Sequence, residues 1–215
     1  MKIDKESIMR DQRELMIKEH LIARGISDKK ILNIMGSLQR ENFIPSKYIV
    51  DAYGDHPVPI GHNQTISQPY IVALMSELCE FKGNEKVLEI GCGSGYQSAI
   101  LSGLAEKVFS IERIKPLAEN AEKILKELKC ENVKVIHGDG FNGLTEEAPF
   151  DVILLTAAPE IIPQALINQL SEGGRLVAPV GNTIQQLVRL RKKSGEITSE
   201  TITYVSFVPM VKGSN

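Results

Sequence analysis

Three glycines, each separated by a single residue, stand between an apolar run and a predicted helix. Residues 87–100 read VLEIGCGSGYQSAI, with Gly91, Gly93 and Gly95 in the turn. Glycine lets the backbone turn sharply and approach a ligand without a Cβ clash, and the start of a helix offers unpaired N–H groups that suit a polar group. Glu112 ends the next predicted strand, where a carboxylate can accept hydrogen bonds from both hydroxyls of a ribose. These residues predict a site for a nucleotide-like ligand.

The spacing of the glycines distinguishes two classes of such ligand. A dinucleotide-binding turn reads GxGxxG, but its sixth position is Tyr96 here. The GxGxG pattern resembles the first motif of Rossmann-like methyltransferases, which implies S-adenosyl-L-methionine as cofactor and S-adenosyl-L-homocysteine as product. In those enzymes an acidic or polar residue after the third strand contacts the adenine amine, and Asp139 of Gly138-Asp139-Gly140 holds that place. Cys92 and Gly140 join the expected cofactor site, although a glycine turn or an Asp-Gly pair alone also occurs without a ligand.

The segment before the glycine loop carries a more specific pattern. Residues 55–73 read DHPVPIGHNQTISQPYIVA and closely resemble the signature of the protein-L-isoaspartate O-methyltransferase family, above all in Pro59-Ile60-Gly61 and Gln64-Thr65-Ile66-Ser67. The resemblance runs from about residue 10 to 211 and includes SIER at 110–113, GDG at 138–140, GGRLVAPVG at 173–181 and FVP at 207–209.

The resemblance implies a protein-repair enzyme. That family methylates the free α-carboxylate of L-isoaspartyl residues in damaged proteins and peptides, and the ester collapses to a succinimide that can reopen to normal aspartate. Ser67 matches the family's active-site serine, and Thr65 and Ile66 lie beside the cofactor in that family. Backbone groups of Pro59, Ile60 and Gly61 would bind the substrate chain by strand addition, with Val208 in the opposite wall, although ordinary strand and core roles are the alternative.

A serine suits this chemistry without a histidine–aspartate pair. An acceptor carboxylate with a pKa of about 4 is already ionised at pH 7, so methyl transfer from a sulfonium needs no strong general base. Holding the reacting atoms in line supplies roughly 7–11 kcal/mol. Ser67 would donate one hydrogen bond to the acceptor, but it also precedes an apolar helix expected from Ser67 to about Glu80, which it could merely cap.

Three departures from the family pattern leave the peptide preference open. Tyr70 stands where histidine is common, Gly61-His62-Asn63-Gln64 replaces a commoner glycine-containing version, and Phe141 follows the GDG segment. The alternatives are an O-methyltransferase acting on a small molecule and a non-catalytic peptide-binding protein with a retained cofactor site. Residues 156–159 read TAAP and not the Asp/Asn-Pro-Pro-aromatic motif of nucleic-acid amino-methyltransferases.

The elements that must position these residues alternate between strand and helix. This alternation predicts an α/β fold with a doubly wound, mostly parallel Rossmann-like sheet and helices on both faces. The expected strands are 87–90, 108–111, 133–136, 151–155 and 175–180, followed by an antiparallel hairpin of 185–191 and 197–208. Two amphipathic helices are expected at the N-terminus, one over 5–23 and one capped by Ser27, and a further helix from Pro163 to near Gly173.

Length and composition agree with one methyltransferase domain. The 215 residues divide into a helical extension (1–45), a substrate-binding segment (46–66) read as an ordered loop with short extended pieces, and a cofactor-binding core (67–215). A net charge of −2 without a long basic run disfavours a nucleic-acid partner. The three scattered cysteines and four histidines show no metal-ligand spacing, so no metal is expected. With no signal-peptide pattern and no membrane-spanning stretch, we expect a cytoplasmic protein, and a monomer is the simplest oligomeric state.

Overall fold

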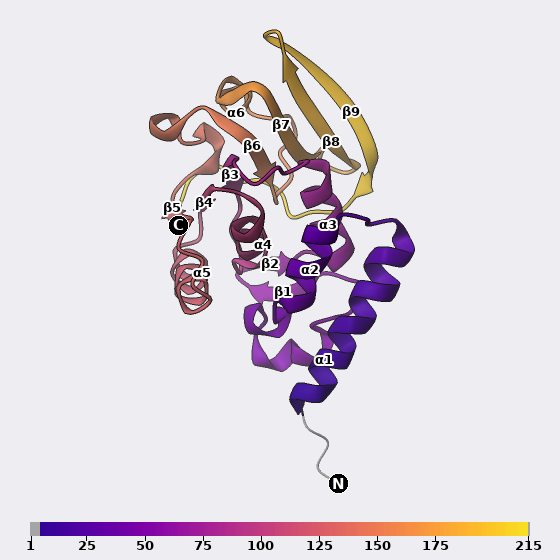
Figure 1. Cartoon of the computed structure of the whole chain (residues 1–215). Helices are drawn as coiled ribbons and strands as arrows, with labels where there is room; N and C mark the ends of the chain where they lie inside the picture. The colour runs from indigo at the N-terminus through magenta and orange to yellow at the C-terminus, as the bar shows by residue number, and fades with distance from the viewer. Residues whose placement is uncertain (1–4, 215) are drawn as a thin grey trace.

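A seven-stranded sheet forms the centre of the computed structural model, which describes residues 5–214 (Figure 1). The strands lie in the order β5-β4-β3-β6-β7-β8-β9. Strands β3 to β7 run parallel, and β8 and β9 add an antiparallel pair at one edge. Their bounds are β3 Lys86–Ile90, β4 Lys107–Glu112, β5 Val133–His137, β6 Phe150–Leu155, β7 Leu170–Val180, β8 Gln185–Lys193 and β9 Glu196–Val205. The predicted α/β fold, mostly parallel sheet and C-terminal hairpin are therefore confirmed.

Alternating side chains of the central strands enter two different apolar layers. Val87 packs in one layer with residues of α3 and α4, whereas its neighbour Leu88 packs in the other layer with Leu166 of α6. Because both faces are covered, the central strands are almost continuously apolar, as parallel strands usually are. The helices are α1 Lys5–Leu15, α2 Lys29–Ser37, α3 Pro69–Leu78, α4 Tyr96–Leu104, α5 Lys115–Glu127 and α6 Gln164–Asn168.

The N-terminal extension packs beside α3 and α4 (Figure 1). Its first helix continues through a π-helical turn and a 3-10 turn and stops at Gly25, near the predicted end. The expected cap of the second helix was wrong. Asp28 caps α2, because its carboxylate accepts hydrogen bonds from the N–H groups of Lys30 (2.8 Å) and Ile31 (3.1 Å). The Ser27 N–H donates instead to Glu77 on α3. Residues 1–4 of the extension lie outside the described residues.

A second, two-stranded sheet stands apart from the main one. Strand β1 (Val58–Gly61) pairs antiparallel with β2 (Gln64–Ile66), and we call residues 58–66 the hairpin. A 3-10 turn at Ser46–Asp51 precedes it, so the predicted irregular segment contains more regular structure than its proline and glycine content indicated. Ser67 follows the hairpin directly, at the entrance to α3.

Three further boundaries differ from the sequence-based expectation. Helix α3 begins at Pro69 and Gln68 is its N-terminal flanking residue, without a side-chain cap, so the interpretation of Ser67 as a helix cap was wrong. The helix after Pro163 ends at Asn168, because β7 already begins at Leu170, which pairs with Phe150. The last strand ends at Val205, and the chain beyond it crosses to the end of β6.

Candidate active site

The glycine loop lies where the order of the strands reverses. The chain passes from β3 to β4 on one side, and β6 later pairs with the other side of β3. Doubly wound sheets bind their ligands at the carboxyl ends of the strands at such a switch point. The loop is fixed there by its backbone, since the Gly91 N–H donates to the carbonyl of Ile111 at 2.8 Å.

Gly91 meets a close neighbour from the next strand. Its φ is +98°, and a Cβ at this position would overlap the hydroxyl of Thr156. Thr156 follows β6, and its hydroxyl donates to the carbonyls of Gly91 and Ile90. A side chain at residue 91 would thus break the contact that joins the ends of two adjacent strands. Gly95 serves a different purpose, because it allows α5 to approach, with Ala121 3.2 Å from where a Cβ would be, and it does not line the cavity.

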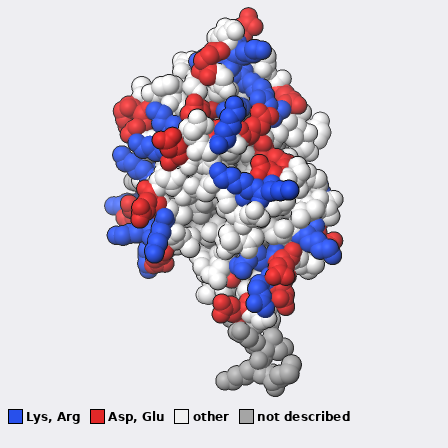
Figure 2. Space-filling model, viewed as in Figure 1, with Lys and Arg blue, Asp and Glu red and all other residues white. Residues whose placement is uncertain are grey.

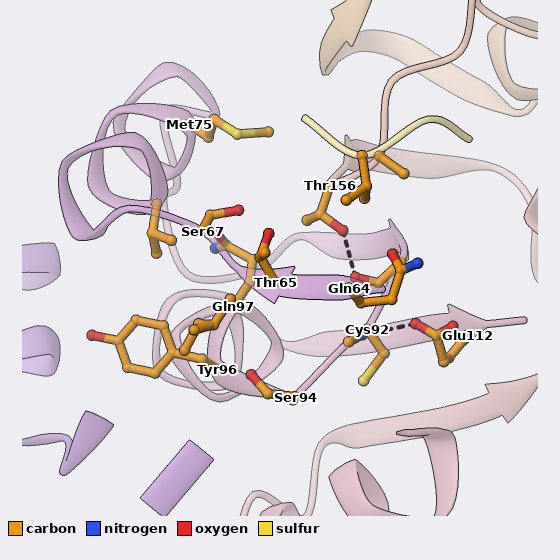
Figure 3. A pocket seen from close by; sticks show the side chains of 16 residues that line it. Gln64, Thr65, Ser67, Met75, Cys92, Ser94, Tyr96, Gln97, Glu112 and Thr156 are labelled. Atoms are coloured by element: carbon orange, nitrogen blue, oxygen red, sulfur yellow. Dashed lines mark hydrogen bonds between the residues drawn. The ribbon is translucent and has the colours of Figure 1, made fainter. Parts of the chain in front are cut away.

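Glu112 connects the glycine loop to the end of β4. One carboxylate oxygen accepts the Gly93 N–H at 2.8 Å, and the other accepts the Ile114 N–H at 2.9 Å. The side chain is 5% exposed and borders the cavity beside the loop (Figure 3). Each oxygen keeps a second lone pair, so the fixed carboxylate can still accept two hydrogen bonds from a ligand.

The hairpin faces the glycine loop across one cavity. Residues 64–67 line one side of it, and Gly91, Cys92 and Gly93 line the other; we call this space the central cavity. Figure 3 shows the hydroxyls of Ser67 and Thr65 directed into its middle, whereas the hydroxyl of Thr156 bonds to the backbone of the loop. Residues far apart in the chain therefore form the walls of one space, with two hydroxyl groups inside it.

Two further cavities adjoin the central one and share its walls. The hairpin-side cavity shares Thr65, Ser67, Thr156 and Val208 and extends along 204–207. The Gly140-side cavity shares Gln64, Gly91, Glu112 and Ala157 and extends to Gly140 and 209–211. Ser67 lies at the junction of the central and hairpin-side cavities, and Glu112 lies at the junction of the central and Gly140-side cavities. The three cavities therefore form one path past the glycine loop.

The C-terminal segment closes part of this path. The carbonyl of Val208 accepts the Ala158 N–H at 2.9 Å, and the Met210 N–H donates to the Ala158 carbonyl at 2.7 Å. Val208 thereby lies beside Ser67, where the central and hairpin-side cavities meet; its predicted contact with a substrate stays a prediction.

Asp139 and three hairpin residues do not line the central cavity. One carboxylate oxygen of Asp139 accepts the Phe141 N–H at 2.9 Å, and the other accepts the Gly213 N–H at 2.8 Å, so this side chain ties the C-terminal segment to the end of β5. Its neighbour Gly140 borders the Gly140-side cavity. Pro59 and Gly61 are exposed, and Ile60 is buried beneath the loop with its Cδ1 near Gly93. The predicted ligand contacts of these residues stay predictions.

Several lining residues were missed by the sequence reasoning. Thr156 and Ala157 could have been found, because they follow the strand that pairs with β3 and so must end beside the glycine loop. The others come from helix positions that look like ordinary amphipathic helix residues: Met75, Tyr96 and Gln97.

A buried acidic network lies under the loop. Both Ser98 and Ser110 donate hydrogen bonds to one oxygen of Glu89, which has no exposure to solvent. Burial raises the pKa of Glu89 to about 7, and it raises the pKa of the Cys92 thiol to about 12. Cys92 is thus a neutral wall residue and not a nucleophile. Within residues 5–214, no group of three or more His, Cys, Asp or Glu side chains is placed to hold a metal ion.

The fold and this site define the class of Rossmann-like α/β enzymes that bind a nucleotide-like ligand on a glycine loop. Comparison with known proteins names the family. Residues 10–215 match the family model described as protein-L-isoaspartate(D-aspartate) O-methyltransferase. Protein-L-isoaspartate O-methyltransferase of Vibrio parahaemolyticus is 49% identical over 193 residues, covering 90% of this chain and 93% of that relative. The protein of the same name from Trichlorobacter lovleyi is 49% identical over 201 residues, with 93% of each covered.

Solved structures agree with the sequence relatives. A structure of such an enzyme from Plasmodium falciparum, in complex with S-adenosyl-L-homocysteine, has a TM-score of 0.82 at 28% identity and covers 94% of this chain and 99% of that one. Another protein-L-isoaspartate O-methyltransferase has a TM-score of 0.80 at 29% identity, covering 92% of this chain and 65% of the other. The chain belongs to the protein-L-isoaspartate(D-aspartate) O-methyltransferase family.

Proposed function

We propose that this chain transfers a methyl group from S-adenosyl-L-methionine to the free α-carboxylate of L-isoaspartyl residues, with Ser67 as the residue that orients the acceptor. The observation that carries this proposal is the position of Ser67 at the junction of the central and hairpin-side cavities. Membership of the family supports the reaction, and the geometry supports the role of the serine.

The residues of the central and Gly140-side cavities fit the cofactor. Gly91 leaves a space that a side chain would fill, and Glu112 offers two fixed acceptors at a place suited to ribose hydroxyls. Backbone N–H groups at the start of α4 suit the carboxylate of the methionine part. When bound, S-adenosyl-L-methionine supplies an electrophilic methyl group on a sulfonium sulfur. Thr65, Ile66, Cys92 and Gly140 would form the remaining walls.

The hairpin-side cavity suits a peptide. It lies between Gln68 at the entrance to α3 and the segment 204–208, and it opens directly onto Ser67. Strand β1 follows Pro57 in the wall of this cavity, and with Pro59 and Gly61 outward it offers backbone groups for an added strand. A peptide held there would reach the junction with the carboxylate of its isoaspartyl residue.

Ser67 acts by orientation in this proposal. The acceptor carboxylate is ionised at neutral pH, so no residue has to remove a proton. A hydroxyl that donates one hydrogen bond fixes one carboxylate oxygen and leaves the other free to form the new O–CH3 bond. A hydrogen bond to a charged group contributes about 1.5–3 kcal/mol, which sets the size of the effect expected when it is removed.

Labelled cofactor and paired peptides test the reaction. The purified chain is incubated with methyl-labelled S-adenosyl-L-methionine and two peptides that differ only in L-isoaspartate against L-aspartate. Base-labile label on the isoaspartyl peptide alone is the expected result. Label on neither peptide, despite measurable cofactor binding, would overturn the proposed function.

Replacement of Ser67 tests its role in the same assay. Ser67→Ala should lower kcat/KM for the isoaspartyl peptide by about 10- to 100-fold, and the dissociation constant of the cofactor should change little. Ser206→Ala is the matched control, since this exposed serine also lines the hairpin-side cavity but lies away from the junction. Activity of Ser67→Ala equal to that of the unsubstituted chain would remove Ser67 from the mechanism.

The proposed partners are proteins and peptides with isoaspartyl residues. Positive and negative side chains are interspersed over the face shown in Figure 2, without the single-sign surface that a nucleic acid would need. No helix of the described residues has the length and apolar character that crossing a membrane requires. A single methyltransferase domain that works as a monomer in the cytoplasm remains part of the proposal.

A further inference from the structure

Arg40 is a completely buried arginine close to the proposed acceptor site. It belongs to the 3-10 turn Arg40–Phe43 of the N-terminal extension, and none of its surface is exposed. Its Nε donates to the carbonyl of Ala52 at 2.7 Å, and its Nη2 donates to the carbonyl of Ser67 at 2.8 Å. One planar guanidinium thus joins two backbone points.

These two points flank the hairpin. Ala52 follows the 3-10 turn Ser46–Asp51 and begins the segment 52–57 that leads into β1, and Ser67 is the first residue after β2; we call residues 52–57 and Ser67 the stem of the hairpin. The hairpin forms no strand pairing with the main sheet, so its placement depends on contacts other than a continuous hydrogen-bond ladder. Because the guanidinium fork is rigid, it sets the separation of the two stem ends and with it the position of Ser67.

The charge of Arg40 is not balanced by a neighbouring carboxylate. Among the described residues Arg40 forms no ion pair, its Nη1 has no hydrogen-bond partner, and its guanidinium carbon lies 4.8 Å from the ring centroid of Tyr96. The hydroxyl of Tyr96 attracts this charge, and Tyr96 is one of the residues that border the central cavity. Carbonyls and an aromatic ring offset the burial of this charge only in part, so an anion bound nearby would be stabilised by it.

A second buried arginine, Arg175, also binds two backbone carbonyls, and we take its role as purely structural. Arg175 donates from Nε to the carbonyl of Cys79 at 2.7 Å and from Nη2 to the carbonyl of Glu80 at 2.8 Å. It is also paired with Glu85, at 3.3 Å. Neither arginine borders the three cavities, but Arg40 bonds the backbone of Ser67, which does, and only Arg175 has a carboxylate partner among the described residues.

We propose that Arg40 is a positioning residue of the methyl transfer: it holds Ser67 and the hairpin through the carbonyls of Ser67 and Ala52, and its unpaired charge favours binding of the anionic acceptor carboxylate. This inference rests on the proposed function. The serine hydroxyl contacts the acceptor directly, whereas Arg40 acts from behind it. The arrangement attracts the carboxylate without a direct ion pair that would stabilise the anion before transfer.

Two substitutions separate the effect of the rigid guanidinium fork from the effect of the positive charge. Arg40→Lys keeps the charge and loses the fork, and Arg40→Gln loses both. Arg40→Lys should lower kcat by about tenfold and leave the KM of the isoaspartyl peptide near that of the unsubstituted chain. Arg40→Gln should lower kcat similarly and also raise the peptide KM by about tenfold, with the cofactor dissociation constant unchanged within about threefold. Arg175→Lys and Arg175→Gln are the matched controls, which should lower the melting temperature without this split between kcat and KM.

Amide hydrogen exchange gives a readout that does not depend on catalysis. Exchange of the amides at 64–67 should accelerate in both Arg40 variants and in neither Arg175 variant. If the unsubstituted chain methylates no isoaspartyl peptide, the proposed function fails, yet the exchange result still decides whether Arg40 holds the hairpin. The inference is overturned if Arg40 and Arg175 variants give the same kinetic and exchange profiles. It is equally overturned if both Arg40 variants fail to fold while the Arg175 variants fold, because Arg40 would then support the whole fold and not the hairpin.

Discussion

The glycine loop and the hairpin line the same cavity, but different kinds of contact hold them. The loop continues from β3, which is paired on both sides in the main sheet, and its own backbone bonds to the end of β4. The hairpin has only its own two strands, and side chains from other segments fix it. Apart from Arg40, the Gln68 side chain donates to the carbonyl of Asp55 at 2.9 Å, and Arg24 forms an ion pair with the Asp55 carboxylate at 2.8 Å.

This difference separates the binding of the cofactor from the binding of the peptide. Backbone contacts in a covered parallel sheet tolerate many side chains, so a loop built on them is constant in position. A hairpin held by side chains changes its position when those side chains change, and it borders the cavity that we assign to the variable substrate. We therefore expect substitutions in the loop to affect the cofactor and substitutions around the hairpin to affect the peptide.

The largest expected effect distinguishes two glycines with similar backbone angles. Gly91 and Gly61 have φ values of +98° and +92°. Alanine at either position costs about 1–2 kcal/mol of backbone strain, but only at Gly91 would the new Cβ overlap Thr156, since nothing lies within 4 Å at Gly61. Gly91→Ala should weaken cofactor binding by about 100-fold or more in calorimetry, and Gly61→Ala should leave it within about threefold. Similar cofactor affinities of the two variants would contradict the role of the Thr156 contact.

The next effect is the pH dependence of the free energy of unfolding that comes from Glu89, which is buried under the glycine loop. Burial raises the pKa of Glu89 from its ordinary 4.5 to about 7, so the folded protein holds a proton that the unfolded chain has already released. The stability from this group is complete below pH 4.5 and is lost as the pH rises through 7, by about 3 kcal/mol in the free energy of unfolding. The Glu89→Gln variant should not show this loss of stability, because glutamine does not titrate.

Urea denaturation at several pH values measures this effect. The free energy of unfolding of the unsubstituted chain minus that of Glu89→Gln should fall by about 3 kcal/mol between pH 4.5 and pH 8. A constant difference over this range would show that folding does not perturb Glu89.

A moderate effect should distinguish two carboxylates near the cofactor. Glu112→Gln keeps the size of the side chain but turns one acceptor into a donor that faces an N–H group, so cofactor affinity should fall by about 10- to 100-fold. Asp139→Asn alters a carboxylate that already bonds two backbone N–H groups and borders none of the three cavities, and a smaller loss is expected. A larger loss for Asp139→Asn would instead support direct contact of Asp139 with the adenine.

The smallest effect concerns Tyr70, which stands where the family commonly has histidine. The guanidinium of Arg24 lies 3.6 Å from the centroid of the Tyr70 ring and also forms an ion pair with Asp55. The Tyr70 ring therefore stabilises the ion pair between Arg24 and Asp55, which precedes the hairpin. Tyr70→Leu should raise the peptide KM by about three- to fivefold, and Tyr70→Phe should leave it unchanged, because the contact needs the ring and not the hydroxyl. The cofactor dissociation constant should be equal in both variants; a change in that constant would contradict the division between loop and hairpin.

Local sequence was sufficient for the features that depend on local rules. The alternation of strand and helix predicted the parallel sheet, since strands covered on both faces must be apolar throughout. The glycine spacing and the strand end at Glu112 predicted the loop and its acidic partner, because residues that end adjacent parallel strands meet at one edge. The predicted cap at Ser27 was wrong because the next residue, Asp28, accepts the first N–H groups of α2, and the predicted cap at Ser67 was wrong because α3 begins two residues later and has no side-chain cap.

The sequence by itself determined the fold class, the glycine loop and the family, because each depends on residue types at short spacings along the chain. Only the tertiary structure decided which side chains from distant parts of the chain contact the residues of the site. Arg40 and Ser67 are 27 residues apart, and Thr156 and Gly91 are 65 apart, so no local pattern shows that each pair is in contact. Tertiary contacts also turned the Asp139 carboxylate toward backbone N–H groups and left Arg40 without a carboxylate partner in the described part of the chain, since those outcomes depend on which groups the folded chain brings within hydrogen-bond distance.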